Sequence, residues 1–369
     1  MLISQEESSA NFIQPVQQSI FDEDKLLVYR ELYYNGFSSI IAARDLTSGA
    51  AVAVKKVEFS FFKPCPFSIT KLKENYANKI NEQAAKIRAI THTSVVKLME
   101  YVIEPKRVTI MTEMCMFGDL FNWMLQQAQL RVRDICLVVQ NIFQALRFLH
   151  SQGYVHGALS PTTVLFQSVS PQSVTIMPDL SVRAEVLKLA RVEPPIMDHF
   201  APECLKTNTL EQGEDNKKTI EDGFATDQCT STKASDIWSV GIIAHIAFTG
   251  KAPFRGRNAF ELLKNIEATN GESRNEMFHT LSSLIRNQVN RSLSVNPETR
   301  LTAEEGSEVY WFDDEETKND NRNILMTIEY ELLSTCRRYR NQGRQVFENV
   351  FRKFNVSSTS LPENALHER

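Results

Sequence analysis

The chain has 369 residues, of which 42% are hydrophobic, and it carries a formal net charge of −4 at pH 7. This length allows one large domain with extensions, and the apolar share is sufficient for a sizeable core. The slight acidity argues against a broad basic surface, so no nucleic-acid partner is expected. The six cysteines are scattered without a C-x-x-C pair, which predicts reduced thiols rather than a zinc site or a disulfide scaffold.

The sequence carries no signal for secretion or membrane insertion. Its first twenty residues are polar and glutamine-rich, with neither a basic start nor an apolar signal-peptide region. No run of about eighteen apolar residues occurs along the chain, so no membrane span is expected. We therefore predict a cytoplasmic protein, with the nucleus and the cell cortex as further compartments that fit the sequence.

Strand patterns dominate the first part of the chain. After a flexible extension over residues 1–25, the apolar run 26–46 reads as a strand, residues 47–49 as a turn, and the β-branched run 50–57 as the next strand. These segments predict the antiparallel opening of a small β-rich lobe.

A loop, a helix and two further strands are expected next. Residues 57–70 include two prolines that forbid a regular element, which predicts a loop. Apolar residues recur at helical spacing over 80–90, and the short apolar runs 95–104 and 107–114 read as strands.

From Asp119 the sequence is mostly helical, which predicts a second, larger lobe. Residues 210–227 are polar and charged, so we interpret them as a solvated insertion. A buried-looking helix follows over residues 236–250, and helical periods continue to Phe312. Together these elements predict an α+β fold with two lobes over residues 26–312.

Residues 313–369 predict an acidic linker followed by an amphipathic helix and tail. The stripe that defines the helix consists of Ile324, Leu325, Ile328, Leu332, Val346, Phe347, Val350 and Phe351. The helix either packs on its own lobe or binds a partner. We favour the first, because packing within the chain usually supplies helical stability.

Several motifs resemble those of protein kinases. They are V-A-V-K ending at Lys55, T-E-M-C-M-F-G-D-L beginning at Thr112, H-G-A-L-S beginning at His156, A-P-E ending at Glu203, S-D-I-W-S-V-G around Asp236, and N-P-E-T-R ending at Arg300. In this order and spacing they resemble a kinase domain from residue 28 to residue 312. The resemblance implies a bilobal protein kinase-like fold.

The resemblance also implies an ATP site between the lobes. The residues that would form it are Lys55, Gln83, Thr112, Glu113, Met114 and Asp179. Lys55 stands where kinases keep the lysine that contacts the α- and β-phosphates. Gln83 replaces the glutamate partner of that lysine, with Glu82 as the alternative; Gln83 is preferred because Ile87, four residues on, then faces the core.

Residues that hold the kinase fold together have counterparts here. Glu203 would pair with Arg300, and Asp236 would accept hydrogen bonds from the backbone of the catalytic loop. By the same resemblance, all three are structural.

The chemical groups of the catalytic loop are missing. Phosphoryl transfer needs a carboxylate for the attacking hydroxyl and ligands for magnesium. His156 is retained, but the catalytic aspartate is Ala158, the usual lysine is Ser160, and the magnesium-binding asparagine is Thr163, a poorer ligand. The sequence therefore predicts no catalytic residue.

The two remaining nucleotide motifs are also altered. Tyr33, Asn35 and Ser38 stand at the glycine positions of the phosphate loop, where side chains hinder a close backbone approach. For the D-F-G motif two registers stay open. One register places Pro178, Asp179 and Leu180 there; it loses the metal ligand and buries a carboxylate among apolar side chains. The other places Asp179 on the metal, avoids that burial and is therefore favoured.

These departures predict a pseudokinase that acts as an adaptor or allosteric activator. Among kinase-like proteins the chain most resembles the STRAD adaptors, through G-Y-V-H with its degraded loop and through S-D-I-W-S-V-G-I. This resemblance implies an LKB-type serine/threonine kinase and an armadillo-like scaffold as partners, with ATP bound without turnover and no firm need for magnesium. The end of the chain, N-A-L-H-E-R, lacks that family's terminal tryptophan-bearing motif, which puts the scaffold in doubt.

Two alternatives are carried alongside the adaptor. The chain could be an unorthodox serine/threonine kinase, with Asp198 or His199 replacing the lost base. It could also be a nucleotide sensor, in which ATP binding stiffens the lobes without turnover.

Overall fold

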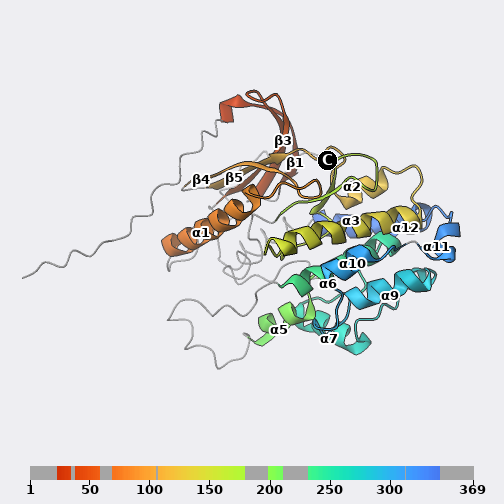
Figure 1. Cartoon of the computed structure of the whole chain (residues 1–369). Helices are drawn as coiled ribbons and strands as arrows, with labels where there is room; N and C mark the ends of the chain where they lie inside the picture. Colours follow the sequence, from red (N-terminus) through yellow and green to blue (C-terminus); the bar gives the residue numbers. More distant parts are fainter. Residues whose placement is uncertain are drawn as a thin grey trace, which may run out of the picture.

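The computed structural model describes residues 23–34, 38–58, 69–104, 107–178, 198–210, 232–311 and 313–340. Figure 1 shows a β-sheet lobe joined to a larger lobe of helices. The predicted α+β, two-lobed arrangement is therefore confirmed. The extension up to residue 22, the insertion after Leu210, Asp179 and the tail beyond Arg340 lie outside the described residues.

An antiparallel sheet forms the first lobe, with the strand order β1-β2-β3-β5-β4. Its strands are β1 (Leu26–Tyr34), β2 (Ser38–Asp45), β3 (Ala51–Glu58), β4 (Leu98–Ile103) and β5 (Arg107–Glu113). A short 3-10 helix, η1 (Glu23–Lys25), precedes β1. Two short strands in the helical lobe, β6 (Val164–Phe166) and β7 (Val174–Ile176), pair with each other.

The run from residue 26 to 46 contains two strands, and the prediction of one strand was wrong. β1 pairs antiparallel with β2, from Leu26 opposite Asp45 to Tyr34 opposite Ser39. The sequence signal for the reversal is the pair Asn-Gly at residues 35–36, which is typical of hairpin turns. Because β-forming residues flank that pair on both sides, the whole run resembles one strand.

Helix α1 (Ile69–Arg88) is longer than predicted and begins inside the predicted loop. The last helix-breaking residue of that loop is Pro66, so nothing in the sequence prevents a helix from residue 69. The core side of α1 consists of Ile80, Ala84 and Ile87, as the apolar spacing predicts.

The second lobe is built around one helix without a polar face. Every residue of α6 (Lys233–Thr249) from Ser235 onward is buried, and α3, α8, α9 and α12 contact it. The helices of this lobe are α2 (Leu120–Leu125), α3 (Val132–Ser151), α5 (Pro202–Leu210), α6, α7 (Ala259–Thr269), α8 (Glu276–His279), α9 (Ser283–Ser292), α10 (Ala303–Glu308), α11 (Glu315–Asn319) and α12 (Leu325–Arg340).

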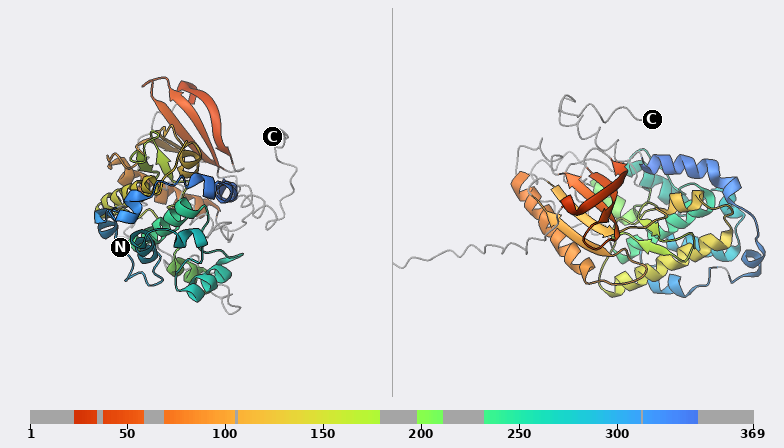
Figure 2. Two further views of the ribbon diagram at one scale, coloured as in Figure 1. Left: turned by 90° about the vertical axis from the view of Figure 1, so that its right-hand side faces the viewer. Right: turned by 90° about the horizontal axis from the view of Figure 1, so that it is seen from above.

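The C-terminal helix α12 packs on its own lobe. It contacts α2 and α6, and both views of Figure 2 show it (blue) lying against the helical lobe. Its buried stripe begins with the predicted Ile324, Leu325, Ile328 and Leu332. The stripe then continues through Cys336 and Tyr339, which the predicted stripe did not include. The prediction of packing within the chain is confirmed for this helix.

The described cysteines are buried and form no disulfide with one another. They are Cys115, Cys136, Cys204 and Cys336. Burial raises the pKa of the Cys115 thiol to about 11, so this sulfur stays protonated and unreactive at neutral pH.

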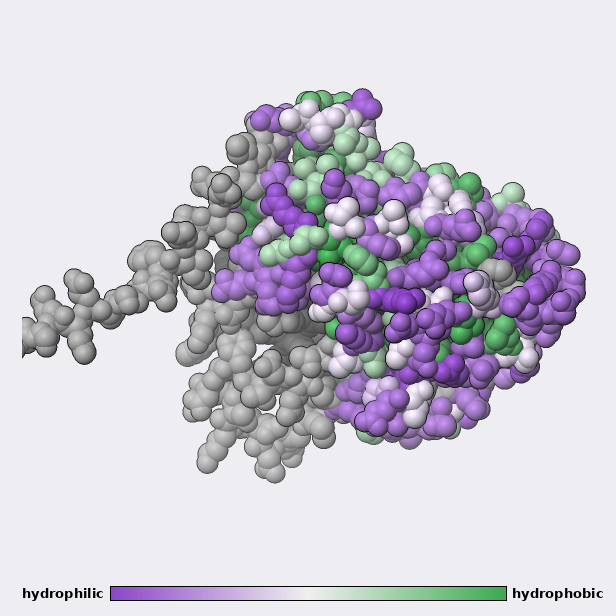
Figure 3. Space-filling model, viewed as in Figure 1, coloured by the Kyte–Doolittle hydropathy of each residue, from purple (hydrophilic) through white to green (hydrophobic). Residues whose placement is uncertain are grey.

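The surface of the helical lobe is largely hydrophilic on the face shown in Figure 3, with hydrophobic residues in small islands. No helix in the described parts of the chain is long and apolar enough to cross a membrane.

Candidate functional site

Lys55 and Thr112 lie on the same face of the β-sheet. β3 and β5 pair antiparallel, with Lys55 opposite Ile110 and Ala53 opposite Thr112. Because side chains alternate along a strand, these four residues share one face. Ile110 belongs to the core cluster that includes the buried residues of α1. The face with Lys55 and Thr112 is therefore the inner face, turned towards α1.

The structure favours Gln83 over Glu82 as the α1 residue that faces this site. Gln83 is half-buried and lies between Ile80 and Ile87 on the core side of the helix. Glu82 is exposed and forms a 2.7 Å ion pair with Lys86, one turn further along. An uncharged amide on the inner side of α1 supplies hydrogen bonds but no ion pair to a lysine.

The segment after β5 joins the two lobes and carries the hinge candidates. The N–H of Met114 donates to the carbonyl of Ala51 at 3.3 Å, and the Glu113 carboxylate accepts the N–H of Lys97 at 2.8 Å. The Thr112 hydroxyl is buried and has no hydrogen-bond partner within the described structure. An orphaned buried hydroxyl is unfavourable, so this oxygen can bind a ligand placed against the hinge.

Asp236 holds the backbone of the predicted catalytic loop. Its carboxylate accepts the N–H groups of His156 at 2.9 Å and of Gly157 at 2.8 Å, and lies 2.9 Å from Nε2 of His150. Asp236 is 1% exposed, so these contacts replace the water that the carboxylate loses on burial. Asp236, on α6, thus fixes the backbone of the loop.

The His156 ring links the catalytic loop to the end of β7. The N–H of Ala158 donates to Nδ1 at 3.2 Å, and Nε2 lies 2.8 Å from the carbonyl of Met177. With Nδ1 as the acceptor, Nε2 carries the hydrogen and donates it to that carbonyl. Both ring nitrogens are used in structural contacts.

The loop positions that follow His156 hold no free acid or base. Ala158 presents a methyl group. The Thr163 hydroxyl accepts the N–H of Ser160 at 2.9 Å and donates to the carbonyl of Ser160 at 3.0 Å. The Ser160 hydroxyl is buried and lies 3.0 Å from the Thr162 hydroxyl. These hydroxyls close the turn of the loop on itself.

The metal candidate, Asp179, lies outside the described residues. β7 spans Val174–Ile176, a strand that both D-F-G registers accommodate, so the choice between them stays a prediction. Elsewhere in the described ranges no group of three His, Cys, Asp or Glu side chains could hold a metal ion.

Arg300 and Glu203 anchor the start of α5 to the core of the helical lobe. The guanidinium donates to both carboxylate oxygens of Glu203, at 2.8 and 3.1 Å. It also donates to the carbonyls of Ala234 and Ser294 and stacks over the Trp238 ring, 5.3 Å from its centroid. The Arg300 side chain is fully buried, so these bonds replace hydrogen bonds that the guanidinium would otherwise make with water.

Asp198, a candidate substitute base, is engaged elsewhere. It is 2% exposed, and the Arg338 guanidinium donates to both of its oxygens at 2.5 and 2.9 Å. Burial raises the pKa of Asp198, and Arg338 opposes that change. A carboxylate held in this way does not reach a substrate hydroxyl. The sequence analysis missed Arg338, although the basic run R-R-Y-R at the end of an apolar stripe was a signal that it could have used.

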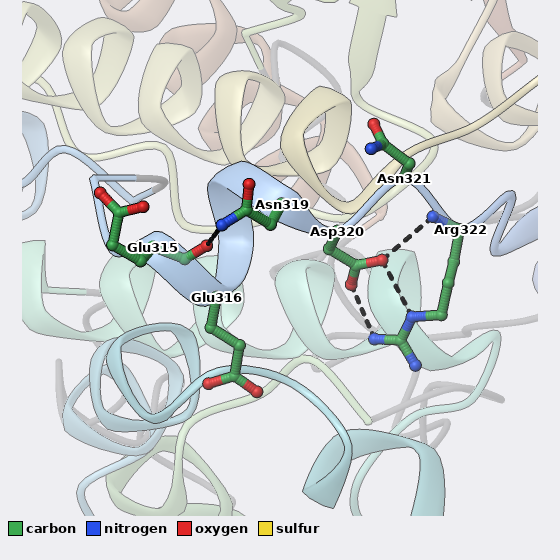
Figure 4. Close-up of a pocket in the computed structure, with 6 residues that line it drawn as sticks. All are labelled: Glu315, Glu316, Asn319, Asp320, Asn321 and Arg322. Carbon is green, nitrogen blue, oxygen red and sulfur yellow. Dashed lines mark hydrogen bonds and ion pairs between the residues drawn. The ribbon is translucent and has the colours of Figure 1, made fainter.

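A cavity of about 530 Å³ opens in the acidic linker, away from these residues (Figure 4). It is lined by Glu315, Glu316, Asn319, Asp320, Asn321 and Arg322. Asp320 and Arg322 pair with each other at 2.7 Å, and the two glutamates point in different directions. None of the predicted site residues lines this cavity, so it does not form part of the site.

The chain is similar in sequence to known protein kinases. Residues 43–308 match the family model described as protein tyrosine and serine/threonine kinase. Serine/threonine-protein kinase H1 of Homo sapiens is 23% identical over 275 residues, which cover 73% of this chain and 60% of that protein. CBL-interacting protein kinase 24 of Oryza sativa subsp. japonica is 24% identical over 353 residues, covering 93% of this chain and 70% of that protein.

The matches do not extend over the full length of these relatives. The serine/threonine-protein kinase H1 homolog of Danio rerio is 24% identical over 251 residues, or 67% of this chain, and the match spans only 54% of that protein. A solved structure, Rad53 1-466 in complex with AMP-PNP, aligns with a TM-score of 0.58 and 18% identity, covering 78% of this chain and 65% of that one. At this identity the likeness shows the fold alone.

Proposed function

Because the chain belongs to the protein tyrosine and serine/threonine kinase family, we propose that it is a pseudokinase, which regulates a partner without transferring phosphate itself. The observation that carries this proposal is Ala158. It lies in a loop held by Asp236 and His156, at the position where the family keeps the catalytic aspartate. The scaffold of a phosphotransfer site is present without its base.

The expected loss in catalytic rate shows whether the remaining activity would be slow or negligible. Loss of a general base typically costs on the order of 10²–10⁴-fold in rate. The magnesium-binding asparagine is also replaced, and its substitute, Thr163, uses its hydroxyl within the loop. Two defects in one site make turnover at a useful rate implausible.

Nucleotide binding fits the residues that remain. Lys55 and Thr112 share the inner face of the sheet, and the Thr112 hydroxyl lacks a partner in the described structure. In this proposal Lys55 neutralises the charge of the phosphates. Thr112 and the segment Glu113–Met114 contact the adenine base of the nucleotide. Asp179 would hold magnesium. The nucleotide then braces the two lobes and stabilises the fold by linkage.

The proposed partner is a serine/threonine kinase of the LKB type, with an armadillo-like scaffold as a further partner, as the STRAD resemblance implies. An adaptor of this kind acts by binding one conformation of its partner better than another. Strand β1 exposes large apolar side chains that such a contact could cover, namely Leu27, Val28, Tyr29, Leu32 and Tyr34.

An active serine/threonine kinase is the second candidate, because the named relatives are called kinases. It would require another base in place of Ala158. Asp198, just before A-P-E, is a candidate, but its burial and its pair with Arg338 argue against that role.

The test combines turnover with nucleotide binding on the purified full chain. Phosphate transfer to a generic substrate is measured for the wild type, for Ala158→Asp and for Lys55→Ala, together with thermal unfolding with and without ATP and magnesium. We expect no turnover in the wild type and an ATP-dependent rise in Tm that Lys55→Ala removes. Turnover in the wild type that Lys55→Ala abolishes would overturn the pseudokinase proposal. Absence of any ATP effect would leave only a nucleotide-free scaffold.

A further inference from the structure

The two halves of α12 are attached to the helical lobe in different ways. At its start, the N–H of Leu130 donates to the Asn323 side chain at 3.0 Å, and the N–H of Ile324 donates to the carbonyl of Leu130 at 2.9 Å. Apolar residues of the first turns are buried beside this anchor. The beginning of the helix is thus fixed both by backbone bonds and by core packing.

The C-terminal half buries Cys336 and Tyr339 and is also attached through arginines. Arg338 binds both oxygens of Asp198, which lies at the end of the segment that leads into α5. Arg340 donates to the Asn122 side chain and lies 3.6 Å from the Asp119 carboxylate, at the N-terminus of α2. Two arginines within one turn therefore connect α12 to two separate elements of the lobe.

The surface under this half of α12 requires positive charge. Both Asp119 and Asp198 are desolvated, and burial raises the pKa of each carboxyl, while the nearby arginine counteracts the change. Without Arg338, the buried Asp198 carboxyl would lose its ion-pair partner on α12, and only Arg255 would still favour its charged form. Removing one partner of such a pair is far more damaging than removing both.

The fit of α12 on this surface is close but incomplete. Gly250 ends α6, and a Cβ there would come within 2.8 Å of the Ile328 carbonyl and of the Leu332 nitrogen. The Thr335 hydroxyl donates to the Gly250 carbonyl at 2.6 Å. Tyr339, in contrast, buries its hydroxyl, which has no hydrogen-bond partner among the described residues. A buried polar group left unsatisfied lowers the free energy needed to detach this end of the helix.

We propose that the C-terminal half of α12 is a releasable latch, whose Arg338 and Arg340 bind the buried Asp198 and the Asp119–Asn122 corner, and whose release loosens residues 198–205 at the start of α5. When the latch opens, residues 332–340 detach, while the hydrogen bond between Ile324 and Leu130 keeps the start of the helix in place. This role holds whether or not the chain transfers phosphate.

The first experiment measures amide hydrogen exchange in the full chain for the wild type, Arg338→Gln and Arg337→Gln. Arg337 is exposed on the same helix and serves as the matched control. We expect Arg338→Gln to accelerate exchange in residues 332–340 and 198–205 together, on the order of 10²-fold, with little change in residues 142–150. Arg337→Gln should behave like the wild type.

Asp198→Asn keeps the experiment decisive if Arg338→Gln fails to fold, because it removes the buried charge while the half-exposed Arg338 stays hydrated. The double variant Asp198→Asn/Arg338→Gln should exchange no faster in residues 332–340 than Asp198→Asn alone, since no unpaired charge remains. Additive acceleration in the double variant, or loosening of α12 with residues 198–205 unchanged, would overturn the proposal.

A peptide in trans tests release directly. A fluorescent peptide of residues 332–340 should bind the Arg338→Gln/Arg340→Gln chain, whose own latch is weakened, at least about tenfold more tightly than it binds the wild type. The same peptide carrying both glutamines is the control and should not bind. Equal binding of the peptide to both chains, or no binding to either, would refute a releasable latch.

Discussion

Asp236 offers the sharpest test of how the catalytic loop is held. In Asp236→Ala the backbone N–H groups of His156 and Gly157 lose their acceptor, and so does the ring of His150. The site is buried, so water does not replace the carboxylate without rearrangement. Two orphaned buried backbone donors at about 1–3 kcal/mol each lower the free energy of unfolding by about 2–6 kcal/mol.

Asp236→Asn separates charge from hydrogen bonding at this position. Its amide keeps one acceptor oxygen but turns an NH₂ group towards the remaining donors, so an intermediate loss is expected. Asp313→Ala is the matched control, because Asp313 is exposed and pairs only on the surface with Lys318. This control should change the free energy of unfolding by no more than about 0.5 kcal/mol.

The assay is urea unfolding followed by circular dichroism, combined with hydrogen exchange at residues 156–157. The reasoning predicts a lower midpoint at an unchanged m-value and faster exchange of those amides. If Asp236→Ala loses less than about 1 kcal/mol and the loop amides stay protected, another acceptor replaces the carboxylate and the account of the loop is wrong.

Two further predictions concern buried positions of the helical lobe. Burial lowers the pKa of His245 to about 4 from its ordinary 6.5, so the folded chain binds fewer protons than the unfolded chain between these values. The free energy of unfolding should therefore fall by about 3 kcal/mol as pH drops from 6.5 to 4, and His245→Gln should flatten this slope; equal slopes in urea titrations would contradict it. Gly306→Ala would place a Cβ 2.2 Å from the buried Phe143 ring and should lower the free energy of unfolding by about 1–3 kcal/mol or more. Gly153→Ala is the control: its Cβ meets open space, so it should lose only the about 1–2 kcal/mol that a left-handed backbone costs. Thermal unfolding measures both changes.

Local patterns in the sequence predicted most of the elements that form the site. The 3.6-residue period of Ile80, Ala84 and Ile87 placed the core side of α1 correctly, because burial of one helix face is visible in sequence spacing. The motif around Asp236 likewise pointed to a residue that holds the catalytic loop, and the structure places it there.

Contacts between distant segments had no comparable signal. Arg338 and Asp198 are separated by 140 positions, and no periodic pattern relates a tail arginine to a carboxylate before A-P-E. The reversal between β1 and β2 was missed for a different reason, since strand-forming residues on both sides outweighed the turn signal. Asp179 and the choice of D-F-G register lie outside the described residues and stay predictions.

The packing of α12 sets where the folding unit ends. The family match stops at residue 308, yet Leu332 and Tyr339 are buried against the lobe and Gly250 touches the α12 backbone directly. A recombinant chain cut at the family boundary would expose this apolar surface and the two carboxylates beneath it to solvent. We expect such a fragment to aggregate, and one that ends at or beyond residue 340 to stay monodisperse in size-exclusion chromatography. For this protein the useful boundary for expression is defined by a helix that lies beyond the end of the family match.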